Sequence, residues 1–305
     1  MKRRDFLKSC LACGTAAMLG ASGKAWGVSS FEGYPDRMGV LVDLTRCVGC
    51  RSCEAACNKE QGLPEPDLPF DDQSVFEEKR RPTEKAYTVV NRYEAEKEET
   101  TIYRKIQCNH CNEPACLTSC FVNAYTKTRE GAVIYNPKVC VGCRMCMTAC
   151  PFNVPAYSYS SAFNPVVKKC IFCYETRLKN GRPPACVEIC PQEVLSFGNR
   201  NEMLKIGHER IRHMPERYVD HIYGENELGG TSWFYLAGVD FSQAGFDTTV
   251  GNEPIISSVK EFLGIVPMVL TIWPALFTGF HLLAKHKQSR SEHDADHSGQ
   301  EGPRR

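Results

Sequence analysis

The chain has 305 residues, a hydrophobic fraction of 42%, and 37 Lys and Arg against 36 Asp and Glu. A net charge of +1 provides no basic footprint, which argues against a nucleic-acid partner. The 18 cysteines stand in a chain long enough to build a core without covalent staples, so they indicate metal or redox chemistry.

The N-terminal segment predicts export. Arg3 and Arg4 precede Phe-Leu-Lys, and a weakly apolar stretch over 11–20 leads to small residues around Ala25. A twin-arginine pair is an export address, and the rest has the layout of a cleavable signal peptide. We predict a twin-arginine (Tat) signal over residues 1–27, which would deliver an already folded protein to the periplasm. The alternative is a chance arginine pair on a basic cytosolic N-terminus.

Sixteen cysteines then form four groups with the spacing of iron-sulfur ligands. The third group runs Cys-Val-Gly-Cys-Arg-Met-Cys-Met-Thr-Ala-Cys-Pro and matches the bacterial ferredoxin pattern, including its terminal proline. Thiolates are soft donors that suit such clusters. We predict four [4Fe-4S] clusters in an α+β fold of duplicated bacterial ferredoxin-like modules. The groups are Cys47/Cys50/Cys53/Cys57, Cys108/Cys111/Cys116/Cys120, Cys140/Cys143/Cys146/Cys150 and Cys170/Cys173/Cys186/Cys190.

Two other uses of cysteine fit less well. Disulfide frameworks belong to short secreted chains with cysteines scattered through loops. Zinc ribbons pair C-x-x-C units but lack the run of three cysteines with a fourth at x3, which the first and third groups contain.

The first and third groups repeat one another. A short apolar strand after Gly39 runs into the first group, and a similar strand after Gly131 runs into the third. Gly49 and Gly142 occupy the same place in the two turns, where a residue without Cβ lets the backbone fold closely over a cluster. Such a repeat indicates duplicated units. The second and fourth groups have longer loops and close with C-x3-C, which we expect on short helices.

The predicted four-cluster domain covers 28–200 and contains an insertion over about 70–107. Two β-rich runs, 87–93 and 100–106, flank the charged stretch 94–99 and predict a hairpin. This hairpin is either a solvated excursion or a docking site for a partner subunit. His110, between two cysteines, is expected to be a tuning or surface residue rather than a ligand.

The segment 201–254 is predicted to be a partner-docking extension. A strand over 194–197 precedes it, a helix is expected over 202–214, and the aromatic strand 233–237 is either core or partner surface.

The C-terminal part predicts a membrane anchor over 255–285. Residues 262–284 contain no Lys, Arg, Asp or Glu. As a helix they span about 34 Å, enough for a hydrocarbon core of about 30 Å. The alternative is a buried core helix, whose apolar run is usually shorter. Lys285 and Lys287 follow, which places the tail 286–305 in the cytoplasm. We expect this polar tail to be disordered, and lone His281 in the anchor to have no ligand role.

From Gly39 to about Phe197 the chain resembles the four-cluster subunits of the dimethyl-sulfoxide reductase and nitrate reductase superfamily. The resemblance implies that the first group pairs with the fourth and the second with the third. It implies four ligand sets: set A (Cys47, Cys50, Cys53, Cys190), set B (Cys57, Cys170, Cys173, Cys186), set C (Cys108, Cys111, Cys116, Cys150) and set D (Cys120, Cys140, Cys143, Cys146).

Within that superfamily the segment from His221 to Gly224, the run Gly229 to Thr231 and the C-terminal apolar helix resemble the HybA-type subunits of membrane-bound uptake [NiFe]-hydrogenases. This implies an electron-transfer subunit, with no catalytic residues, that links a periplasmic hydrogenase to a polytopic quinone-reactive membrane subunit. Alternative partners are a molybdenum oxidoreductase or a multihaem cytochrome. A cluster enzyme acting on a small molecule would need an incomplete ligand set, and every set here is complete.

Overall fold

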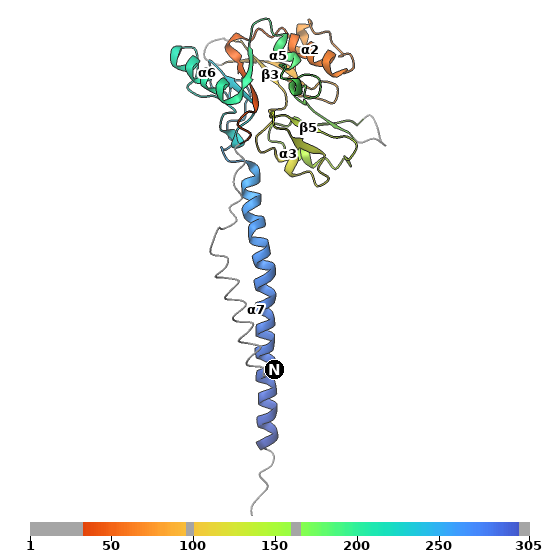
Figure 1. Cartoon of the computed structure of the whole chain (residues 1–305), viewed down its shortest axis with the longest axis vertical. Coiled ribbons are helices and arrows are strands. Elements are labelled where there is room, and N and C mark those ends of the chain that lie inside the picture. The colour runs from red at the N-terminus through yellow and green to blue at the C-terminus, as the bar shows by residue number, and fades with distance from the viewer. Residues whose placement is uncertain (1–32, 96–100, 160–165, 299–305) are drawn as a thin grey trace, which may run out of the picture. The chain divides into compact units, whose positions relative to one another are not determined.

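A computed structural model describes residues 33–95, 101–159 and 166–298 of the chain, and for 258–265, 267, 268 and 290–298 it describes the backbone alone (Figure 1). The predicted signal peptide, with Arg3 and Arg4, lies outside the described residues, as does the outer part of the predicted hairpin tip. Contacts divide the chain into Phe31–Ile256 and a second unit that includes the segment from Ser257 onward.

A three-stranded sheet forms the centre of the larger unit. Strand β1 (Met38–Asp43) pairs antiparallel with β8 (Leu195–Asn199) and parallel with β9 (Trp233–Leu236). Val40, Leu41 and Val42 of β1 are buried, as expected for a strand covered on both faces. The chain leaves β1 toward the first cysteine group and enters β8 just after the fourth. The sheet therefore brings the two ends of the cysteine region together.

Short helices carry the paired cysteines and pack in two couples. Helix α2 (Ser52–Gln61) lies against α5 (Ala185–Glu188), and α3 (Ala115–Thr118) lies against α4 (Met145–Thr148). The C-x3-C closures predicted on short helices are confirmed at α3 and α5. The couples join the first group to the fourth and the second to the third.

The repeat of the first and third groups extends to the backbone. Gly49 and Gly142 have φ of 70° and 71°, and the arginines that precede α2 and α4, Arg51 and Arg144, are also left-handed, with φ of 58° and 63°. A Cβ on Gly49 would lie 2.4 Å from the Tyr103 ring, so this turn requires glycine. The left-handed arginines had no signal in the sequence.

Three two-stranded ribbons complete the strands found in the described residues. The predicted hairpin is confirmed as β2 (Val89–Glu94) paired with β3 (Thr101–Ile106), with Val89 opposite Ile106. The others are β4 (Tyr125–Lys127) with β5 (Val133–Tyr135), and β6 (Ala156–Tyr157) with β7 (Val167–Lys168).

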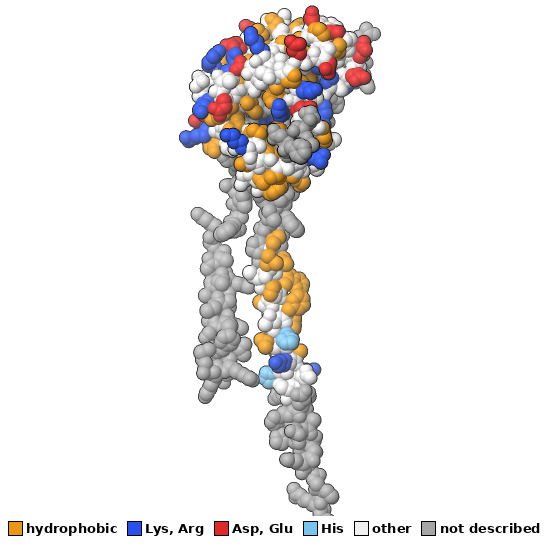
Figure 2. Space-filling view, turned by 90° about the vertical axis from the view of Figure 1, so that its right-hand side faces the viewer, with side chains coloured by type: hydrophobic (Ala, Val, Ile, Leu, Met, Phe, Trp, Pro, Cys, Tyr) orange, Lys and Arg blue, Asp and Glu red, His pale blue; other side chains and the backbone are white. Residues whose placement is uncertain are grey.

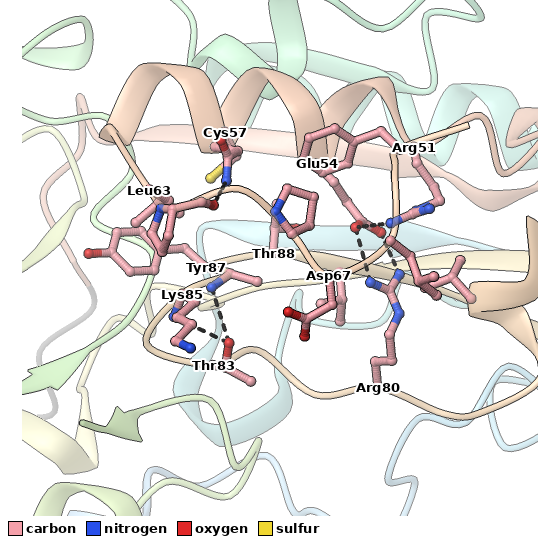
Figure 3. A pocket seen from close by; sticks show the side chains of 18 of the residues that line it. Arg51, Glu54, Cys57, Leu63, Asp67, Arg80, Thr83, Lys85, Tyr87 and Thr88 are labelled. Atoms are coloured by element: carbon pink, nitrogen blue, oxygen red, sulfur yellow. Dashed lines mark hydrogen bonds and ion pairs between the residues drawn. The ribbon is translucent and has the colours of Figure 1, made fainter. Parts of the chain in front are cut away.

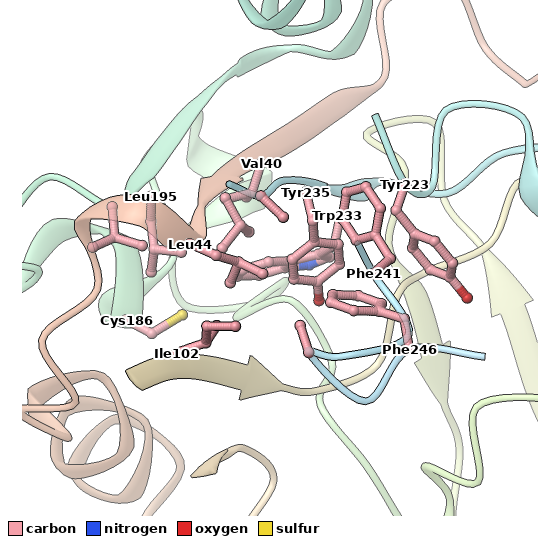
Figure 4. Packing of buried hydrophobic residues seen from close by; sticks show 14 of the residues in the cluster. Val40, Leu44, Ile102, Cys186, Leu195, Tyr223, Trp233, Tyr235, Phe241 and Phe246 are labelled. Carbon is pink, nitrogen blue, oxygen red and sulfur yellow. The ribbon is translucent and has the colours of Figure 1, made fainter. Parts of the chain in front are cut away.

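The segment after the fourth group is part of the same compact unit as the cysteine region. Helix α6 (Arg200–His213) packs on β1 and β8, and β9 completes the central sheet. Trp233, Phe234 and Tyr235 are at most 1% exposed. Of the two roles predicted for this aromatic strand, it is therefore part of the core and not a partner surface. Figure 4 shows Trp233 and Tyr235 among further aromatic rings, with the Cys186 sulfur at the opposite end of this core.

Helix α7 runs from Ile255 to Ser298. Within the described residues, none of the helices combines the length and the apolarity that a membrane crossing requires, so the predicted anchor is not confirmed. Part of the predicted span falls on residues described by backbone alone. Where side chains of α7 are described, large apolar ones are exposed (Figure 2), among them Leu270, Trp273, Phe277 and Phe280.

The tail predicted to be disordered beyond Arg290 is instead helical as far as Ser298. Residues 286–298 contain neither glycine nor proline, so nothing in this stretch interrupts the backbone hydrogen bonds of α7.

Candidate metal centre

Thiols of the first and fourth groups are neighbours. Burial raises the pKa of Cys47 to about 11, the Gly49 amide opposes this, and the Cys190 and Cys50 thiols raise the pKa further. Burial also raises the pKa of Cys53, with an added contribution from Cys47. The cysteines of set A thus lie together, although one of them comes from the far end of the cysteine region.

Set B is gathered in the same way. Burial raises the pKa of the Cys57 thiol, and the nearby Cys170, Cys186 and Cys173 thiols raise it further. Burial raises the pKa of Cys173 to about 11, and Cys186 adds to this after the opposing Ala185 amide.

The thiols of set C line one small enclosed cavity. Cys108, Cys111 and Cys116 come from the second group and Cys150 from the third, and Lys169 also lines the cavity. Burial raises the pKa of Cys116 to about 12, Lys169 lowers it, and Cys108 and Cys150 raise it.

Set D completes the pattern. Burial raises the pKa of the Cys146 thiol, the Tyr125 hydroxyl lowers it, and Cys140, Cys143 and Cys120 raise it. Among the described residues, no three Cys, His, Asp or Glu side chains converge on a position for a single metal ion.

The four sets follow one another in a line. At three places a thiol of one set is close enough to raise the pKa of a thiol in the next set: Cys186 acts on Cys53, Cys108 on Cys170, and Cys146 on Cys116. The spatial order is therefore A, B, C, D. Cys50 of set A and Cys143 of set D are the two thiols classed as exposed among the sixteen. Val48 and Val141, two residues before them, are each 55% exposed.

Three lysines lie near the thiols, of which Lys105 and Lys169 are buried and Lys127 is half-buried. Burial lowers the pKa of Lys105, but the thiolates of sets A and B raise it more, and the net direction is upward. Lys169 shows the same balance with thiols of sets B and C. Burial lowers the pKa of Lys127 to about 7, and its Nζ donates to the carbonyls of His110 and Cys111, each at 2.9 Å. The sequence alone does not indicate that Lys105 and Lys169 are buried.

His110 is fully buried, which excludes the surface role that was one of two expectations. Its ring stacks on Phe172 with centroids 4.8 Å apart, and the Val133 N–H donates to Nδ1 over 2.9 Å. Burial and three lysines hold its pKa well below the usual value, so the neutral ring carries its proton on Nε2. That buried atom has no partner among the described residues. A cofactor with acceptor atoms at the adjacent thiols would satisfy it.

A polar network ties the insertion to α2. Glu54, one residue after Cys53, accepts hydrogen bonds from Arg80 Nη2 at 2.7 Å and from the Val90 N–H at 2.6 Å, and it pairs with Arg51 at 3.3 Å. Figure 3 shows Glu54 between the two guanidinium groups, in a pocket that also includes Cys57. The insertion thus holds the helix that carries ligands of sets A and B.

The fold and the thiol geometry define a protein built to hold iron-sulfur clusters. Sixteen soft donors in closed sets fit cubanes of the bacterial ferredoxin type, and the unpaired His110 nitrogen fits a bound acceptor. In agreement, residues 100–200 match the family model of the 4Fe-4S dicluster domain.

Similarity to known proteins extends over most of the chain. It is 49% identical over 290 residues to a protein of Nitratidesulfovibrio vulgaris, covering 94% of this chain and 78% of that one. It is 33% identical to the hydrogenase-2 operon protein HybA of Escherichia coli O157:H7, covering 79% and 82%. It is 30% identical to the iron-sulfur subunit of the nitrate-inducible formate dehydrogenase of Escherichia coli K12, covering 68% and 70%.

The chain belongs to this family of iron-sulfur subunits of oxidoreductase complexes. The prediction of an electron-transfer subunit that is not itself the catalytic component is confirmed by this membership.

Proposed function

We propose that the chain holds four [4Fe-4S] clusters, one in each of the sets A, B, C and D. The observation that carries the proposal is the line of four thiol sets, each drawing on two cysteine groups. When bound, the clusters would supply one-electron carriers, so that the protein relays electrons from one end of the line to the other.

The two ends of the line of thiol sets are suited to electron exchange with partner proteins. Cys50 and Cys143 are exposed there, and apolar side chains such as Val48 and Val141 stand beside them. Exposed apolar residues rimmed by polar ones are typical of protein contacts. One end would face a catalytic subunit and the other a quinone-reactive membrane subunit.

A hydrogenase is the catalytic partner we favour. The HybA similarity covers 79% of the chain at 33% identity, against 68% at 30% identity for the nitrate-inducible formate dehydrogenase subunit. The second candidate is a molybdenum enzyme, which the formate dehydrogenase similarity supports. A multihaem cytochrome partner remains a weaker alternative.

We further propose that the protein is exported by its twin-arginine signal and held on the periplasmic side of the cytoplasmic membrane by the apolar part of α7. The charge-free run 262–284 and the exposed Leu270, Trp273 and Phe277 support this.

Changing Arg3 and Arg4 to Lys tests the export route, because it preserves the charge but removes the twin-arginine export signal. The precursor should then accumulate in the cytoplasm with its clusters present, and undiminished periplasmic protein would refute this route.

Anaerobic purification with iron and sulfide analysis tests the cluster content. Four cubanes require about 16 iron and about 16 labile sulfide per chain, and a stable preparation with half that iron would contradict the proposal.

Electron paramagnetic resonance (EPR) tests which cysteines belong to the same ligand set. Cys47→Ser and Cys190→Ser should perturb one and the same signal, whereas Cys150→Ser should perturb another. A signal shared by Cys190 and Cys140 would overturn the assignment.

A further inference from the structure

Lys105 is a buried cation whose contacts are all neutral. It lies on β3 and is 4% exposed. Its Nζ donates to Thr88 Oγ1 at 2.7 Å and to Gln107 Oε1 at 3.0 Å, and it lies 4.7 Å from the centroid of the Trp233 ring. These contacts satisfy the hydrogen-bonding capacity of the ammonium but do not cancel its charge, which is costly to bury uncompensated.

Lys169 is a second buried cation farther along the line. It is 2% exposed, and its Nζ donates to the carbonyls of Val133 at 2.5 Å and Cys170 at 3.1 Å. It lines the cavity of set C, while its neighbour Cys170 belongs to set B.

The two lysines therefore lie at successive junctions. Lys105 is close to Cys186, Cys170 and Cys57 of set B and to Cys53 of set A. Lys169 is close to Cys108 and Cys116 of set C and to Cys170 of set B. One positive charge is thus placed between sets A and B, and one between sets B and C.

We infer that Lys105 and Lys169 are tuning residues, which act as fixed buried cations that raise the reduction potentials of the clusters on both sides of their junctions. The inference rests on the proposed cluster sets. Reduction adds one electron and hence one negative charge to a cluster. A nearby cation in a site of low dielectric favours that form. Because each lysine acts on two adjacent clusters, it moves both of their potentials in the same direction.

Redox titration of the intact purified protein, followed by EPR, tests this. Lys105→Met keeps the aliphatic stem and removes the charge. The clusters of sets A and B, identified through the Cys→Ser variants, should become harder to reduce. At a fixed potential the ratio of reduced to oxidised cluster should fall at least tenfold, about 59 mV for one electron, while set D is unchanged. In Lys169→Met, the clusters of sets B and C should become harder to reduce instead.

Lys138→Met is the matched control. Lys138 is exposed and lies two residues before Cys140, so water and salt screen its charge and the potentials should not move by a comparable amount. The inference is overturned if Lys105→Met leaves all potentials unchanged, or shifts all four clusters equally, at full iron content. A wild-type protein with fewer than four clusters would instead overturn the proposed function.

Gln107→Glu covers the case in which Lys105→Met fails to assemble. It places a carboxylate oxygen where the amide oxygen now accepts from Lys105 Nζ at 3.0 Å. The pair neutralises the cation with little change of shape, and the potentials of sets A and B should again fall. Unchanged or raised potentials in this variant would also refute the inference.

Discussion

Replacing Glu54 with Ala should loosen the attachment of the insertion to α2. Glu54 is 4% exposed and Arg51 is 1% exposed at the side chain, with Arg80 at 24%. Removing the carboxylate leaves the Arg51 charge buried without its anion and the Val90 N–H without its acceptor. Breaking a buried pair in this way costs about 3–5 kcal/mol.

For a unit the size of Phe31–Ile256, each kcal/mol lowers the unfolding midpoint by about 2–4 °C. The Glu54→Ala midpoint should therefore fall by roughly 6–20 °C. The assay is anaerobic thermal unfolding followed by circular dichroism at one scan rate, with iron content measured for each variant.

Glu175→Ala serves as the control, because it removes only the exposed pair with Lys179. Such a pair contributes up to about 1 kcal/mol, so the midpoint should move by less than about 4 °C. The reasoning is refuted if Glu54→Ala lowers the midpoint no further than Glu175→Ala does.

Three other outcomes are expected. A hydrogen bond from Thr176 and the Arg177 guanidinium lower the pKa of Glu60. The stability that this group contributes is therefore present above the ordinary carboxylate pKa of about 4.3 and is lost as pH falls through the lower folded value. Between pH 6 and 3 the thermal midpoint of Glu60→Gln should fall less than that of the wild type. Gly224→Ala should destabilise the unit, because φ is +95° and a Cβ would lie 2.7 Å from the Trp233 carbonyl oxygen, whereas Gly251→Ala, with open space around it, should be nearly neutral in the same melt. Truncation after Ser258 should leave an exported, soluble protein with full iron that no longer supports donor-dependent quinone reduction in membranes but still reduces a soluble dye; full quinone reduction would show that the helix is dispensable.

The cluster region could be predicted closely because its signals are local. A C-x-x-C turn and a C-x3-C helix are each specified within a few residues, and the glycine at position 49 reports directly on its left-handed turn. The hairpin was likewise visible in two β-rich runs. Such features need no knowledge of distant parts of the chain.

What the sequence did not predict depends on distant contacts. Lys105 lies in a charged hairpin sequence that resembles a solvated strand, and only the fold shows that Trp233 and the thiols surround it. The parallel pairing of β1 with β9 joins residues almost 200 positions apart, so the extension was predicted as a separate segment. The polar composition beyond Arg290 predicts disorder, but helix α7 continues to Ser298, and residues 286–298 contain no helix breaker.

The position of β1 at the centre of the sheet imposes a waiting time during synthesis. This strand emerges from the ribosome early, yet its hydrogen-bonding partners are β8 and then β9, the last of which ends at Leu236. At about 5–20 residues per second, the apolar sequence of β1 stays without its second partner for roughly 10–40 s. An unpaired apolar strand is prone to join other chains during that interval. Nascent chains that stall before Leu236 should therefore aggregate through β1, even when all sixteen cysteines have already been made.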